Sequence, residues 1–153
     1  MTSYSKRFGS DHLWTSSAKG TVPKGSLEGG HESDGTPLYV VRAAHGDGVH
    51  PGKVNPNSRG AFIAWGGEEV LLSSYDVLQD DGGVAWRPAR HGDIPGDAFE
   101  VGQESDGTPL YVARASWEGG LHPGKIRDGF RGVHLSYGGG EHEVASYEVL
   151  CRV

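Results

Sequence analysis

The sequence predicts an all-β protein made of two tandem repeats of ~70 residues, packed as a pseudo-twofold β-sandwich-like unit. Two observations carry this prediction: a long segment that occurs twice, and short apolar runs separated by glycine-containing turns. The 26 glycines and 8 prolines are spread through the 153 residues and leave no room for long helices. These features exclude a helical bundle, a coiled coil and a transmembrane helix.

The repeat has a period of 72 residues. The segment ESDGTPLYVVRA at 32–43 returns as ESDGTPLYVARA at 104–115. The same offset places HPGKV at 50–54 on HPGKI at 122–126, and SYDVL at 74–78 on SYEVL at 146–150. Residues 20–78 align with 92–150 without a gap, and about half of the pairs are identical. We therefore expect a frayed lead at 1–10, a first repeat at 11–82 and a second repeat at 83–153.

Each repeat shows the pattern of several short strands. Runs rich in aromatic and β-branched residues occur at 37–43, 60–65, 75–78, 133–137 and 147–150. Segment 68–78 also fits a short helix, but its copy at 141–150 fits less well, so we predict strand there. A unit of ~70 residues has a marginal core by itself, and the two copies are therefore expected to pack on each other.

Many residues kept in both copies have a structural explanation. We predict turns with positive φ at six glycines: Gly35, Gly66, Gly67, Gly107, Gly138 and Gly139. Pro37 and Pro109 are predicted to begin strands, and Trp14 and Trp86 to lie in the core or between the repeats. Arg42 and Arg114 are predicted to pair with carboxylates across the sheet.

Charge and cysteine content restrict the partners and the compartment. The net charge is −6, and the 14 lysines and arginines are scattered without a basic stripe, so no nucleic-acid partner is expected. Cys151 is the single cysteine; it cannot form an internal disulfide and is expected to be a small buried hydrophobe. The first residues contain no apolar signal segment, so a cytoplasmic location is predicted, with release by a non-classical route left open.

The repeated polar residues indicate a duplicated binding site. Asp34 and Asp106 lie in Ser-Asp-Gly, where an aspartate that merely caps a turn is an equally good explanation. Lys53 and Lys125 lie in a predicted Pro-Gly-Lys turn, whose geometry does not need a lysine. One carboxylate and one ammonium that converge from two loops make a clamp for neighbouring sugar hydroxyls.

Six further residues are candidates for contacts around this clamp. The residues that could support the clamp from behind are Glu32, Glu104, His50 and His122. The residues that could form a side wall of the pocket are His45 and Trp117, in the loops before the lysines. These two loops differ between the copies, so the two pockets are expected to differ in affinity or preference.

Motifs for catalysis or metal binding are missing from the repeats. HPGKV lacks the first glycine and the hydroxyl residue of a phosphate loop, and there is no nucleophile elbow. Only His50 and His122 repeat among the eight histidines, without metal-ligand spacing, so neither a metal nor a cofactor is expected. The paired carboxylates at Glu68-Glu69 and at Glu141 and Glu143 differ between the copies, which argues against a duplicated glycosidase.

The repeated pattern resembles the DM-nine domain family, also called natterin-like. The resemblance rests on ESDGTPLYV-x-RA, HPGK and SY(D/E)VL in each repeat, and it covers Trp14 to Leu150. Some members with two tandem units are mannose-binding lectins of invertebrate immune recognition, and others respond to infection inside cells. The resemblance implies an all-β, calcium-independent protein that tends to form homodimers. It also implies that sugar is held by the aspartate of the D-G-x-P turn and the lysine of P-G-K, here Asp34 and Lys53, with Asp106 and Lys125.

The sequence thus predicts a non-catalytic lectin for mannose or mannose-containing glycans, without a membrane span. The alternative is an intracellular interaction or infection-response scaffold with the same fold and no working sugar site. An enzyme acting on glycans or phosphorylated sugars has only the repeated lysine in its favour.

Overall fold

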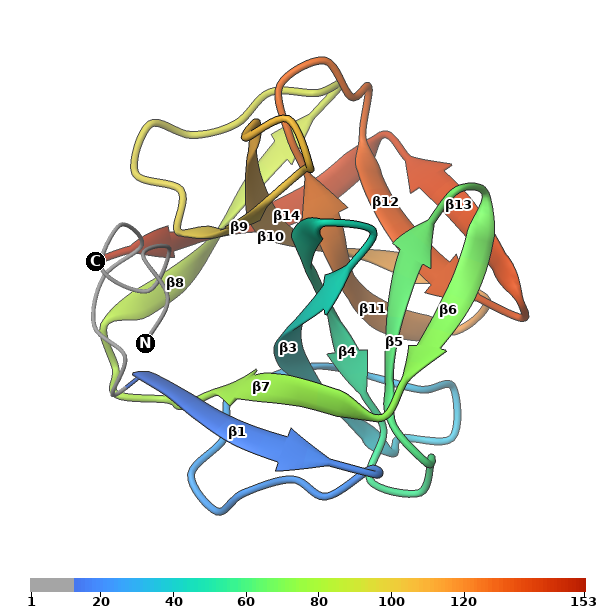
Figure 1. Cartoon of the computed structure of the whole chain (residues 1–153). Helices are drawn as coiled ribbons and strands as arrows, with labels where there is room; N and C mark the ends of the chain where they lie inside the picture. The colour runs from blue at the N-terminus through green and yellow to red at the C-terminus, as the bar shows by residue number, and fades with distance from the viewer. Residues whose placement is uncertain (1–12) are drawn as a thin grey trace.

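The computed structural model describes residues 13–153, and the predicted lead at 1–10 lies outside them. Fourteen strands and no α-helix occur in the described part of the chain (Figure 1). The strands of the first repeat are β1 (Trp14–Ala18), β2 (Glu28–His31), β3 (Pro37–His45), β4 (Gly48–Val54), β5 (Ala61–Trp65), β6 (Glu68–Leu72) and β7 (Ser74–Leu78). Those of the second are β8 (Val84–Arg90), β9 (Glu100–Gln103), β10 (Pro109–Trp117), β11 (Gly120–Ile126), β12 (Val133–Tyr137), β13 (Gly140–Val144) and β14 (Ser146–Arg152).

The all-β prediction is confirmed, and several local predictions with it. Segment 68–78 forms β6 and β7 rather than a helix. All six turn glycines have positive φ, between 60° and 92°. Pro37 and Pro109 are the first residues of β3 and β10. No helix that could cross a bilayer is found in residues 13–153.

The two repeats share one sheet, which closes on itself. Six strands form a ring in the order β3-β2-β11-β10-β9-β4, and β4 pairs with β3 to close it. Two bridges of this ring join the repeats: His31 on β2 pairs with Leu121 on β11, and Val49 on β4 pairs with Gln103 on β9. The additional strands extend from this barrel, so the pseudo-twofold halves interlock through hydrogen bonds as well as packing.

A second junction between the repeats lies at the β5–β6 and β12–β13 hairpins, which lie side by side (Figure 1). The amide of Glu69 donates to the carbonyl of Gly139, and the amide of Glu141 donates to the carbonyl of Gly67, at 2.9 and 3.1 Å. The side chains repeat this exchange, since Glu141 Oε1 accepts from the Gly67 amide and Glu69 Oε1 from the Gly139 amide. The hairpins are thus fixed against each other by the same contacts in both directions.

The central hydrophobic cluster contains equivalent residues from both repeats. The pairs Leu27 and Phe99, Val40 and Val112, and Leu78 and Leu150 are buried in it, and Trp14 and Trp86 pack against it. The prediction that these tryptophans lie in the core or between the repeats is confirmed. Each repeat also has a cluster of its own. Because the shared cluster needs both copies, the repeats stabilise each other.

The predicted ion pairs across the sheet are present. Arg42 Nε donates to Asp76 at 3.0 Å and Arg114 Nε donates to Glu148 at 2.9 Å. The Arg114 guanidinium also lies 4.0 Å from the centre of the Trp86 ring. Cys151 is buried as predicted, and burial raises the pKa of its thiol to about 11.

Candidate functional site

The HPGK segments lie in strands, and the prediction of a Pro-Gly-Lys turn is wrong. Pro51 lies between Val49, which pairs with β9, and Lys53, which pairs with β5. At this change of partner the edge of β4 requires no amide donor, so the strand tolerates a proline. Gly52 is needed for close approach, since a Cβ there would lie 2.2 Å from the carbonyl oxygen of Phe62. The two residues that look like a turn in the sequence therefore serve a strand that exchanges neighbours.

Each repeated lysine reaches into the other repeat. Lys53 Nζ donates to His122 Nδ1 at 2.9 Å and to the carbonyl oxygen of Ser136 at 2.5 Å. Lys125 Nζ donates to His50 Nδ1 at 3.2 Å. Both lysine side chains are only 3% exposed. The sequence predicts a clamp within each repeat, whereas these lysines are held between the repeats.

Acidic side chains surround the two ammonium groups. Glu32 and Glu69 act on Lys53, and both favour its charged form, but burial has the larger effect and lowers the pKa of Lys53. Around Lys125 the corresponding residues are Glu104 and Glu141, and burial again lowers the pKa of the lysine. Glu32 accepts a hydrogen bond from Asn55, and Glu104 is paired with Arg127 at 2.7 Å. These bonds hold the carboxylates in place beside the lysines.

The two aspartates are exposed and fold the turns that carry them. Asp34 Oδ1 accepts from the amide of Thr36 at 2.9 Å, and Asp106 Oδ1 accepts from the amide of Thr108 at 3.0 Å. These hydrogen bonds hold the pKa of each aspartate below its ordinary value. Within residues 13–153, no hydrogen bond or ion pair joins either aspartate to the lysine of its own repeat. The turn of Asp34 does carry Glu32, which acts on Lys53.

Each aspartate turn lies against a hairpin tip of the opposite repeat. A Cβ at Gly119, in the β10–β11 tip, would lie 3.3 Å from Cβ of Ser33, next to Asp34. In the other half, a Cβ at Gly48 would lie 3.3 Å from the carbonyl carbon of Glu104. We therefore define the first site as Asp34, Lys53 and the Trp117 hairpin, and the second site as Asp106, Lys125 and the His45 hairpin.

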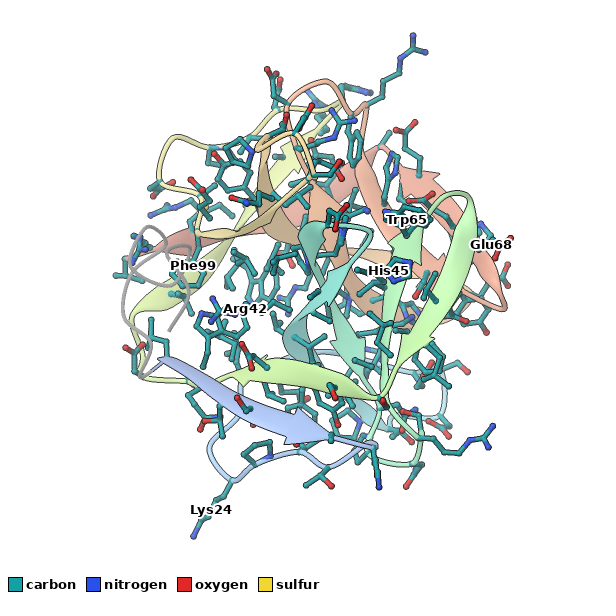
Figure 2. The ribbon with its side chains drawn as sticks, viewed as in Figure 1. Lys24, Arg42, His45, Trp65, Glu68 and Phe99 are labelled. Carbon is teal, nitrogen blue, oxygen red and sulfur yellow. The ribbon has the colours of Figure 1, made fainter. Side chains whose placement is uncertain are left out.

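The two aromatic walls differ in geometry. Trp117 stacks on His142 with 4.5 Å between the ring centres and 23° between the planes. His45 meets Trp65 edge to face at 4.8 Å, and Figure 2 shows these two side chains next to each other. Trp65 is 40% exposed. Each loop borders the site of the other repeat, and a difference in affinity between the two sites stays a prediction.

The histidines of HPGK are neutral and fully buried. Burial, together with the facing lysine, lowers the pKa of His50 and of His122 to about 4. A neutral imidazole accepts at one nitrogen, as the contacts with the lysine ammonium groups require. Described residues 13–153 contain no group of three or more histidine, cysteine, aspartate or glutamate side chains placed to hold a metal ion.

Several residues of these sites were not predicted from the sequence. Glu69 and Glu141 enter the sequence argument only as members of two carboxylate pairs, Glu68-Glu69 and Glu141 with Glu143, that differ between the copies. The aromatic side chains of Tyr137, Trp65 and His142 were not predicted as walls; the Tyr137 ring lies 5.2 Å from that of His122. A usable signal was present for four of the five, because Glu69 and Trp65 fall on Glu141 and Tyr137 at the offset of 72. His142 falls on Val70 and gave no such signal.

The fold is that of a duplicated all-β domain whose two repeats share one closed sheet. The DM9 repeat model matches residues 7–70 and 32–144, so the chain belongs to the DM9 repeat family, which confirms the resemblance found in the sequence. No curated protein matches the chain. Among solved structures, the nematode sperm cell motility protein MFP2B matches with a TM-score of 0.67 and 17% identity. The match covers 91% of this chain and 46% of that chain, so this chain spans about half the length of MFP2B.

Proposed function

We propose that this protein binds mannose or mannose-containing glycans without catalysis, at the first and second sites. The observation that carries the proposal is the repeated inter-repeat site itself. Each site has a fixed ammonium group, an exposed ionised aspartate on the adjoining turn, and an aromatic wall from the opposite hairpin.

This set of groups suits a sugar. An ammonium has three N–H donors, and the contacts of Lys53 with His122 and Ser136 use two of them. The third can donate to a hydroxyl oxygen, while the aspartate accepts from neighbouring hydroxyls and the aromatic wall covers the C–H face of the ring. Charged hydrogen bonds contribute about 1.5–3 kcal/mol each, so a single shallow site binds weakly. Two sites raise the avidity for a branched glycan whose spacing fits them.

The test is a glycan array in EDTA. Wild-type protein is compared with Asp34→Asn/Asp106→Asn, in which the amide oxygen can still accept from the turn amide but the charge is removed. Lys53→Ala/Lys125→Ala is the second variant, with its fold checked by circular dichroism because both lysines are buried. We expect mannose-type signals from the wild type only. A folded wild-type protein that gives a blank array contradicts the proposal.

One observation favours a second function, a protein-interaction scaffold without a working sugar site. Both lysines are buried and already bonded across the repeats, as a structural cross-link would be. A mannose column separates the two functions. A lectin is retained and eluted by free mannose, whereas a scaffold passes through.

A further inference from the structure

Each HPGK histidine has its Nδ1 directed at a lysine of the other repeat. His50 Nε2 lies 3.1 Å from the carbonyl oxygen of His45, while Nδ1 accepts from Lys125. A carbonyl only accepts, so Nε2 carries the proton and Nδ1 presents its lone pair to the ammonium. In the other half, Nδ1 of His122 likewise lies 2.9 Å from the Lys53 ammonium, whereas its Nε2 is buried without a hydrogen-bond partner among residues 13–153.

Packing leaves the two rings little freedom. His50 is 1% exposed and His122 is fully buried. Glycines at 48 and 120 make room for them, since a Cβ there would lie 2.9 and 2.7 Å from the Nε2 atoms of His50 and His122. The direction of each Nδ1 is therefore set by the fold and not by the lysine.

Charged and titratable groups from several strands and turns face the two histidine rings. His122 faces Lys53 from β4, Glu32 from the turn after β2, His31 from β2 and Tyr137 from β12. His50 faces Lys125 from β11, Glu104 from the turn after β9, and His45 from β3. In both places burial has the largest effect on the pKa and keeps the ring neutral above about pH 4.

We infer that His122 and His50 are positioning residues of the sugar sites: each holds the ligand-binding lysine of the opposite repeat through Nδ1, and binding requires the neutral ring. This inference rests on the proposed function and names a regulation of the same sites. Protonation at Nδ1 replaces the acceptor by a donor that faces an ammonium, so the lysine loses its partner and is repelled.

Acid should therefore release mannose before the aspartates are neutralised. Binding at each site falls as the pH drops through about 4, where the two histidines gain their protons. Hydrogen bonds from the turns hold the pKa of each aspartate below its ordinary value, so these carboxylates keep their charge to lower pH than an ordinary aspartate.

The experiment measures mannose titrations of the first site between pH 7 and 3.5, in an Asp106→Ala background, with the fold monitored by circular dichroism. His122→Leu removes the acceptor, and His122→Asn keeps an amide oxygen near the place of Nδ1 but does not titrate. His91→Asn is the matched control, because His91 lies in the turn after β8 at a φ of 58°, which asparagine tolerates.

We expect His122→Leu to lose about tenfold or more in affinity at pH 7. His122→Asn should stay within about threefold of the background protein and no longer lose binding near pH 4, and His91→Asn should titrate like the background.

Equal affinity of His122→Leu and the background protein overturns the inference alone, and so does an unchanged acid profile in His122→Asn. If His122→Leu does not fold, nitrogen NMR of the histidine rings in the wild-type protein decides: a proton on Nδ1 of His122 at pH 7 overturns the inference. Wild-type protein that binds no mannose at pH 7 overturns the proposed function and the inference together. The wild-type titration therefore distinguishes a failure of the proposed function from a failure of the inference alone.

Discussion

Lys53 and His122 are 69 residues apart in the sequence, yet the ammonium nitrogen of the lysine lies 2.9 Å from Nδ1 of the histidine. The pair Lys125 and His50 repeats this contact about the pseudo-twofold axis at 3.2 Å. Strand β4 therefore contributes Lys53 to the first site and His50 to the second, and β11 does the reverse. Neither site exists in a single repeat.

Each aromatic wall comes from the repeat opposite to the aspartate and lysine of its site, and this arrangement gives the first prediction. In an Asp106→Ala background, which leaves the first site, Trp117→Ala should weaken mannose binding about three- to tenfold, because an aromatic face over the sugar is lost. In an Asp34→Ala background, which leaves the second site, the same substitution should have no effect on affinity. Calorimetric or NMR titration measures both, and the opposite pattern would show that each hairpin serves its own repeat.

The close approach at β4 gives a prediction about stability. Gly52→Ala would place a methyl group 2.2 Å from the carbonyl oxygen of Phe62, so β4 and β5 must separate. We expect the free energy of unfolding to fall by about 1–3 kcal/mol, as for other overpacked positions. The control is Gly96→Ala, where a Cβ meets nothing within 4 Å. Urea unfolding of both variants measures this, and equal midpoints would contradict the tight contact.

Acid should destabilise the fold through the two buried histidines. Their pKa is about 4 when folded and close to 6.5 when unfolded, so the unfolded chain binds more protons between these values. The stabilisation is complete above about pH 6.5 and is lost as the pH falls toward about 4, by on the order of 2–3 kcal/mol for each ring. Urea unfolding at several pH values measures it. His50→Asn/His122→Asn should flatten this part of the curve, and a variant curve as steep as that of the wild type would count against buried neutral rings.

His134 should act in the opposite direction. Burial by itself lowers its pKa, but the hydrogen bonds to Glu141 and Glu143 outweigh burial and raise it. The charged ring thus stabilises the fold fully below about pH 6.5, and this contribution is lost as the pH rises through the higher folded pKa. The first repeat has Phe62 at this place. His134→Phe should therefore remove this loss of stability between pH 6 and 8.5 in urea unfolding, and an unchanged slope would assign it to other groups.

Local features of this protein were predictable from the residues alone. The glycine pair at 66–67 forms a turn in any context because positive φ is costly for other residues. The alternation in Val133–Tyr137 predicts a strand, and SYDVL and SYEVL end each repeat in strand as expected. The arginine–carboxylate pairs also followed from charge on neighbouring strands. HPGK was misread because proline and glycine indicate a turn wherever the neighbouring strands are unknown.

The sequence by itself determined the duplication, the period of 72, the all-β class and the residues that recur in both copies. The tertiary structure alone decided which hairpin borders which aspartate, and which histidine holds which lysine. The reason is that two near-identical repeats carry the same strand patterns, so pairing within a repeat and pairing between repeats look alike in the sequence. Only the closed ring, with His31 beside Leu121 and Val49 beside Gln103, selects pairing between the repeats and so builds both sites from both halves.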